Sequence, residues 1–180
     1  MGVLVFSPQP LADERGFFTR TFDAAVAREN GLEPDTLVQD SQSRSRRGVV
    51  RGLHARSDGG EGKLVRCSFG AVHDVAVDLR PSSPTYLSWQ SIRLDDRLHE
   101  SVWLPAGLAH GFQALTDVAD VCYRIDRVHQ PGLDITVRFD DPELGIDWPL
   151  PVTSVSERDR TAPTFAELAP HLPEMFGESR

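Results

Sequence analysis

Few features of this chain set it apart from an ordinary soluble domain. It has two cysteines, Cys67 and Cys122, and both lie in strand-like apolar runs, which predicts buried thiols and neither a disulfide nor a metal clip. No apolar run approaches the roughly 20 residues needed to cross a membrane, and the N-terminal segment MGVLVFSPQP lacks the basic and apolar regions of a secretion signal. The sequence therefore predicts a cytoplasmic protein without a membrane partner.

Positive charge is also scarce. The 19 Lys and Arg residues stand against 27 Asp and Glu residues, for a net charge of −8, which argues against general binding to nucleic acid. An anionic ligand is still compatible with this charge if basic side chains gather in one pocket. With 39% hydrophobic residues in a length of 180, the chain can bury a core unaided, so we expect a single domain over residues 1–180.

Short apolar runs dominate the rest of the sequence. They are rich in Val, Ile, Tyr, Phe and Trp and are separated by Gly, Asp or Pro, which is the pattern of strands and turns. The run VHDVAVDLR alternates, so Val75, Val77 and Leu79 share one face, with His73 packed on it. Regular alternation of strands and helices is absent, which favours an all-β sandwich, jelly roll or small barrel with a few short helices. The predicted strands are TLVQDSQS, GVVRGLH, GKLVRCSFG, AVHDVAVDLR, TYLSWQSIRL, ESVWLPAG, GFQALT, VADVCYRIDR and DITVRFDD.

Two segments are predicted to be helical. In FDAAVARENG, Asp23 is placed to cap a helix and Gly31 to end it. The second segment is the C-terminal tail, residues 160–180, which contains TAPTFAELAPHLPEMF. Residues 1–45 are expected to supply N-terminal strands together with the first helix.

Two of the six histidines stand in suggestive surroundings. His54 ends VVRGLH, where the preceding Gly52 lets another backbone or a ligand come close. His110 ends the pattern P-x-G-x-x-H in PAGLAHGF, which resembles the second half of the signature of cupins, small jelly-roll proteins that often bind a metal. The first half normally supplies two histidines, but HARSDGGEGK has one. Because a transition metal needs three or four good ligands, we expect a jelly roll without a metal.

A wider resemblance covers nearly the whole chain. The segments that carry it, in order, are DERGFF, VQDSQSRSRRGVVRGLH, GKLVR, VHDVAVDLR, SPT, LPAGLAHGF, DPELGIDWP and SERDRTAPT. Together they resemble the dTDP-4-dehydrorhamnose 3,5-epimerase family, the RmlC-type cupins. The resemblance implies a cupin-type jelly roll that needs no cofactor and acts on a nucleotide-linked 4-keto-6-deoxy sugar. It also implies a homodimer with residues 1–45 at the interface.

Epimerisation beside a ketone requires a base, an electrophile at the carbonyl oxygen, and an acid on the opposite face of the ring. His54 can be the base, and Lys63 can offer its ammonium to the developing oxyanion. The resemblance implies that Asp159 of SERD orients the histidine and that Tyr123 is the acid. From the residues alone, a surface lysine and a core tyrosine are the simpler interpretations.

The nucleotide also has candidate ligands. Diphosphate is best held by fixed cationic groups, and Arg51 lies beside the base. The resemblance implies that Arg15 reaches the diphosphate, that Phe18 or Phe17 stacks near the nucleotide base, and that Gln39 contacts thymine. From the sequence alone, Arg15 could instead pair with an acid in its own turn. His110 is a further candidate for contact with the substrate.

Three positions depart from the family pattern. Ser41 stands where an asparagine is usual, and Arg20 replaces a glutamate, so the identity of the nucleotide base stays open. His129 stands where a second tyrosine commonly lies over the sugar. A histidine is shorter and can titrate, so the chain could invert one centre only, accept a different sugar, or carry a neutral change at the pocket edge.

Three classes of function remain open from the sequence. The first is an epimerase that acts at C3, C5 or both, for rhamnose or another deoxysugar. The second is a cupin 3,4-ketoisomerase with similar histidine chemistry, although RGLH and SERD favour the epimerase. The third is a non-catalytic sugar- or nucleotide-binding jelly roll, in which His54, Lys63 and Tyr123 need not converge.

Overall fold

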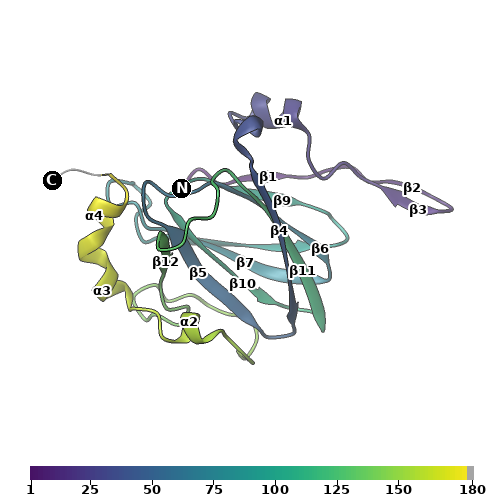
Figure 1. Cartoon of the computed structure of the whole chain (residues 1–180). Coiled ribbons are helices and arrows are strands. Elements are labelled where there is room, and N and C mark those ends of the chain that lie inside the picture. The colour runs from purple at the N-terminus through teal and green to yellow at the C-terminus, as the bar shows by residue number, and fades with distance from the viewer. Residues whose placement is uncertain (178–180) are drawn as a thin grey trace.

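The computed structural model describes residues 1–177 and contains two five-stranded antiparallel sheets packed face to face (Figure 1). The first sheet has the strand order β1 (Leu4–Phe6), β9 (Ser101–Leu104), β6 (Lys63–Phe69), β11 (Val118–Ile125) and β4 (Gln39–Arg46). The second has the order β12 (Asp134–Thr136), β5 (Val50–Arg56), β10 (Leu108–Ala114), β7 (Ala71–Asp78) and β8 (Trp89–Asp95). The predicted all-β jelly roll is confirmed.

One hydrophobic core fills the space between the two sheets. Val65, Val102 and Val121 reach it from the first sheet, and Val72 and Phe112 reach it from the second. Because strand side chains alternate between faces, every second residue of these strands points into this inner space. Site residues on the same alternation therefore share that space.

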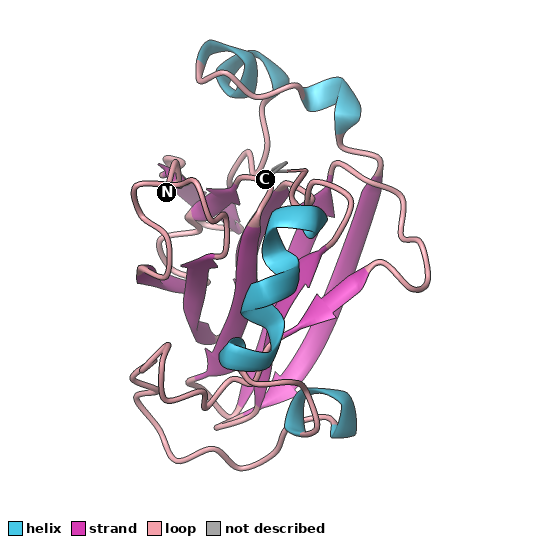
Figure 2. Cartoon of the chain, turned by 90° about the vertical axis from the view of Figure 1, so that its left-hand side faces the viewer, coloured by secondary structure: helices cyan, strands magenta, loops and turns pink. Residues whose placement is uncertain are grey.

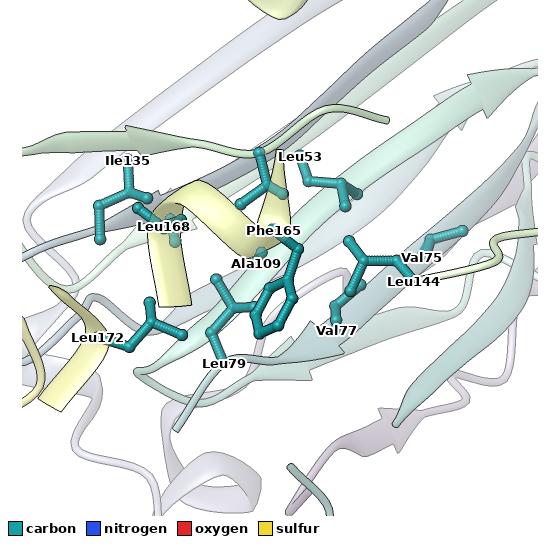
Figure 3. Packing of buried hydrophobic residues seen from close by; sticks show 12 residues of the cluster. Leu53, Val75, Val77, Leu79, Ala109, Ile135, Leu144, Phe165, Leu168 and Leu172 are labelled. Carbon is teal, nitrogen blue, oxygen red and sulfur yellow. The ribbon is translucent and has the colours of Figure 1, made fainter. Parts of the chain in front are cut away.

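A second core covers the outer face of the second sheet. The helical segment formed by α3 (Phe165–Leu168), η2 (Ala169–His171) and α4 (Leu172–Met175) lies across this face (Figure 2). Its Phe165, Leu168 and Leu172 pack against Val77 and Leu79, as Figure 3 shows. The predicted shared face of Val75, Val77 and Leu79 is confirmed, and the cover of helices explains why β7 is buried on both faces.

The helix predictions are correct in position. α1 (Ala24–Glu29) is capped by the Asp23 carboxylate, which accepts a hydrogen bond of 2.9 Å from the backbone N–H of Ala25. The C-terminal tail is helical but divided into short pieces, because Pro170 and Pro173 each lack a backbone N–H. Residues 178–180 of the predicted tail lie outside the described residues.

Some elements were not predicted. These are the hairpin of β2 (Leu11–Asp13) and β3 (Gly16–Phe18), the 3₁₀ turn η1 (Pro34–Thr36) and the short helix α2 (Glu157–Arg160). The hairpin projects away from the two sheets (Figure 1). Its Phe17 ring lies 4.5 Å from the ring of His99, while Leu11 and Phe18 are exposed.

Both cysteines are free. Cys67 is buried, and burial raises the pKa of its thiol to about 12, so the prediction of an unreactive buried thiol is correct there. Cys122 is only half-buried, because its neighbours on β11 turn inward and it faces outward. No helix among residues 1–177 is long and apolar enough to span a membrane.

Strands β5 and β10 approach each other closely at Gly52 and Gly111. A Cβ atom on Gly52 would lie 2.6 Å from the Cα of Gly111 and 3.0 Å from the carbonyl oxygen of His110. Gly52 also has a φ of +135°, which disfavours any side chain. The close backbone approach expected from RGLH is present, and the approaching group is the next strand.

Gly52→Ala should lower the free energy of unfolding by about 3 kcal/mol, because the added methyl forces the two strands apart. Gly59→Ala is the matched control, since Gly59 has a φ of +90° but open space around its Cα. Urea unfolding of the two variants separates crowding from backbone strain. Equal losses of stability would show that the close approach of the strands at Gly52 adds nothing to the cost of a side chain there.

Candidate active site

His54 and Asp159 form a close pair beside strand β5. Nε2 of His54 lies 2.6 Å from Oδ1 of Asp159, although the residues are 105 positions apart. The side chain of Asp159 is 2% exposed, whereas that of His54 is 36% exposed. The predicted contact is therefore present, with a buried carboxylate behind an imidazole that reaches solvent.

The charge on Asp159 determines which nitrogen of His54 can accept a proton. Burial raises the pKa of Asp159. The hydrogen bond and charge of His54, together with the N–H of Gly52, lower it by a larger amount, so the pKa lies below the usual value for an aspartate. Because a carboxylate only accepts hydrogen bonds, neutral His54 carries its hydrogen on Nε2. Nδ1 then holds the lone pair that can take a proton from a ligand.

Helix α2 places Asp159 beside the part of β5 that strand β12 does not pair with. Strand β12 pairs with residues 54–56 of β5, and the N–H of Gly52 instead donates to Oδ2 of Asp159 at 3.3 Å. Ser156 caps the helix by accepting a 3.1 Å hydrogen bond from the N–H of Asp159. Hydrogen bonds thus hold both the backbone and the carboxylate of Asp159 in place.

A bulge brings Arg51 and His54 to the same face of β5. Residues three apart in a regular strand point to opposite faces. Here His54 lies opposite His110, while Arg51 lies opposite Phe112, so β5 holds one residue more than β10 over this stretch. Arg51 consequently lies on the inner face of β5 but at its exposed end, where its Nε donates to the hydroxyl of Ser45 at 3.0 Å and its guanidinium donates to the carbonyl of Arg44 at 3.1 Å.

His110 is held by a carboxylate of its own. Its Nε2 lies 2.8 Å from Oδ2 of Asp74, and the two side chains are 9% and 1% exposed. Because directly opposed residues have Cβ atoms about 5 Å apart, His110 lies beside His54 in the inner space. Asp74 was not predicted. The signal for it is the alternation of β7, which turns Asp74 inward and Val75 outward.

Lys63 and Tyr123 face the same space from the first sheet. Lys63 shares the alternation of Val65, which lies in the inner core, and Tyr123 packs against that core. Tyr123 lies directly opposite Val65 and Ser41 on the neighbouring strands. Facing sheets are about 10 Å apart, so side chains on the inner faces of both sheets project into the same space.

Gln39 and Ser41 lie on the inward alternation of β4, beside Ile125 and Tyr123. The side-chain oxygen of Gln39 accepts a hydrogen bond from the backbone N–H of His129. The His129 ring itself is turned toward Asp134, with Nδ1 at 3.9 Å from its carboxylate, and is 60% exposed. His129 therefore lies next to a predicted nucleotide residue, at an exposed position.

Arg15 and Phe18 do not join the other site residues within one chain. They lie on the projecting hairpin (Figure 1), where Arg15 pairs with Asp13 at 2.5 Å and Phe18 is 66% exposed. Within a single chain, Arg15 therefore forms an ion pair inside its own turn, which was the simpler interpretation from the sequence.

Two further features of residues 1–177 bear on the site. No group of three or more His, Cys, Asp and Glu side chains in this part of the chain is placed to hold a metal ion. A cavity of about 500 Å³ lies between β1, α1 and the segment that joins β3 to α1, and it includes none of the predicted site residues. Its Arg20 and Asp23 pair with each other at 2.8 Å, so it offers no free base.

The fold defines a class of protein, the cupin-type jelly rolls, and a histidine–carboxylate pair lies on the inner face of one of its sheets. Comparison with known proteins identifies the branch. The family model described as dTDP-4-dehydrorhamnose 3,5-epimerase matches residues 1–167. The chain belongs to this family, which is a family of isomerases.

Individual relatives support the assignment. The dTDP-4-dehydrorhamnose 3,5-epimerase of Methanothermobacter thermautotrophicus is 45% identical over 162 residues, which cover 88% of this chain and 87% of the relative. The structure of RmlC from Legionella pneumophila in complex with dTDP-4-keto-L-rhamnose matches with a TM-score of 0.89 at 38% identity, over 95% and 92% of the two chains. ChmJ from Streptomyces bikiniensis, a 3'-monoepimerase in complex with dTDP-quinovose, matches with a TM-score of 0.88 at 32% identity, over 97% and 88%.

Proposed function

We propose that the protein epimerises a dTDP-linked 4-keto-6-deoxy sugar at C3, C5 or both, in the synthesis of rhamnose or another deoxysugar. The observation that carries the proposal is the His54–Asp159 pair, with a buried, ionised carboxylate on Nε2 and a free Nδ1. The relatives add the substrate class, because the Legionella enzyme holds a dTDP-4-keto sugar. We place the reaction in the cytoplasm, as the sequence predicts.

The proposed chemistry divides between the two sheets. Nδ1 of His54 removes the proton from a carbon beside the ketone, and Asp159 stabilises the imidazolium that forms. Electron density moves onto the carbonyl oxygen, where the ammonium of Lys63 donates a hydrogen bond to the enolate. The Tyr123 hydroxyl then delivers a proton to the other face of the carbon, and the configuration is inverted. Tyr123 and His54 each return to their starting protonation before the next turnover.

The nucleotide half of the substrate is assigned to a basic and polar end of the site. Arg51, on the inner face of β5, offers a planar donor for diphosphate, and Gln39, Ser41, His110 and His129 complete the substrate contacts. The assignment of these roles is our proposal, as is the absence of a metal requirement.

We further propose that the protein is a homodimer in which each projecting hairpin completes the site of the partner. The hairpin carries exposed Leu11, Phe17 and Phe18, and apolar side chains grouped on a projecting element are typical of an interface. Arg15 and Phe18 would then reach the diphosphate and the base of the nucleotide in the opposite subunit, which they cannot do in their own.

His54→Asn should remove exchange of sugar protons with solvent, because no base is left, while binding of dTDP stays near wild type. The measurement is deuterium incorporation from D₂O into dTDP-4-keto-6-deoxyglucose, followed by NMR. Asp159→Asn should be milder, with the base present but poorly oriented. Near-normal exchange in His54→Asn would remove the histidine from the mechanism, and migration of the carbonyl would point to a ketoisomerase.

His129→Tyr tests whether one or two centres are inverted. We expect wild type to incorporate deuterium mainly at one carbon, because the shorter histidine supports the rearranged sugar less well during the second inversion. The tyrosine variant should shift incorporation toward both carbons by several-fold. Equal and rapid exchange at C3 and C5 in wild type would show that His129 is a neutral change.

Sedimentation velocity at micromolar concentration should give a dimer. Phe18→Asp should shift the protein toward the monomer and lower exchange, because a charge would enter the apolar contact of the hairpin. Glu14→Gln is the control on the same hairpin turn. A wild-type monomer with full activity would overturn the proposed assembly.

A further inference from the structure

Glu61 is an acidic side chain inside the proposed site that the mechanism above does not use. It lies in residues 57–62, the loop between β5 and β6, two positions before Lys63. Its Oε1 is 3.0 Å from Nζ of Lys63, and the two side chains are 16% and 11% exposed. Among residues 1–177, Glu61 is the only carboxylate that forms an ion pair with this lysine.

The loop is built so that Glu61 has little freedom. It is flanked by Gly60 and Gly62, and a Cβ on either glycine would overlap neighbouring atoms: the backbone of Gly107 for the first, and the ring of Trp103 for the second. The N–H of Gly62 donates to Oδ1 of Asp126 at 2.8 Å, and the N–H of Asp126 donates back to the carbonyl of Gly62 at 3.1 Å. The backbone on both sides of Glu61 is therefore fixed.

The charge of Glu61 is felt by its neighbours. Burial raises the pKa of Asp126, and the nearby negative charge of Glu61 adds to that effect. Asp58 is the main cause of the raised pKa of Arg56, burial opposes it, and the charge of Glu61 adds a smaller upward contribution. The ion pair of Glu61 is with Lys63, at 3.0 Å.

We propose that Glu61 is the positioning residue for Lys63: it holds the ammonium directed into the inner space, and it keeps the substrate diphosphate from binding there. The catalytic consequence rests on the function proposed above. An unanchored lysine side chain samples many rotamers, so an anchor at its charged end fixes where it donates.

The same pair explains how Lys63 can act beside a diphosphate substrate. A lone buried ammonium would attract the diphosphate, which carries its charge in the ground state. When Glu61 neutralises it, Lys63 offers N–H donors but little net charge. It then favours an oxygen whose charge develops only during the reaction, and such an interaction raises kcat more than ground-state binding.

Lys63 is the only lysine in the chain, and this permits a direct test without turnover. Selective ¹³C labelling of lysine gives a single Cε signal, whose line width reports how freely the side chain moves in wild type, Glu61→Ala and Asp58→Ala. Loss of the Glu61 anchor should free the ammonium and narrow the signal. Asp58→Ala, in the same loop but paired with Arg56, should leave the line width unchanged. Equal line widths in wild type and Glu61→Ala would overturn the proposal.

Kinetics of the exchange reaction provide the second readout. Glu61→Ala should reduce kcat about tenfold with little change in KM, because the donor is misplaced, and Glu61→Asp should restore part of the loss. Binding of inorganic pyrophosphate should become several-fold tighter in Glu61→Gln.

The two readouts separate the possible failures. If wild type shows no exchange, the proposed function fails, but the lysine line width and pyrophosphate binding still decide the role of Glu61. If the line width changes while kcat and pyrophosphate binding stay as in wild type, Glu61 is only a structural ion-pair partner and the positioning role is overturned.

Discussion

The close approach of β5 to β10 at Gly52 and Gly111 is the constraint on which the site depends. It admits no Cβ on Gly52, and the bulge beside it places Arg51 and His54 on one face of the strand. The same irregularity leaves the N–H of Gly52 for Asp159. One backbone contact thus sets the direction of the His54 side chain, the orientation of the Asp159 carboxylate and the position of Arg51.

A second constraint is that the ionisable side chains of the site come from both sheets. The second sheet supplies two histidines, each held by a buried carboxylate at 2.6 and 2.8 Å. The first sheet supplies a lysine paired with Glu61 and a tyrosine on the inner alternation. Because buried charges are tolerated only when they are paired, the acidic partners that hold His54, His110 and Lys63 in place also make the burial of these pairs possible.

The N-terminal hairpin lies apart from the other predicted site residues within one chain. Its side chains are exposed, it extends away from the sheets (Figure 1), and its arginine is paired inside the turn. A nucleotide in the inner space of one chain would contact Arg51 from that chain but no residue of the hairpin. The geometry is consistent with an assembly in which hairpins are exchanged, and the exposed phenylalanines then gain a buried position.

The sequence by itself determined the fold class, most strands, the cap at Asp23 and the family, because alternation, turn residues and motifs in order are local signals. It also gave His54 and, through the resemblance, its partner Asp159. Tertiary structure decided the rest. The pairing of Asp74 with His110 became visible only when the strands were packed, since contact between distant segments leaves no local pattern. The pairing of Glu61 with Lys63 depends on how the loop before β6 is held by Asp126. The outward turn of Cys122 and the separation of Arg15 from its own site likewise depend on strand register and on how far a hairpin projects, and both are set by contacts across the fold.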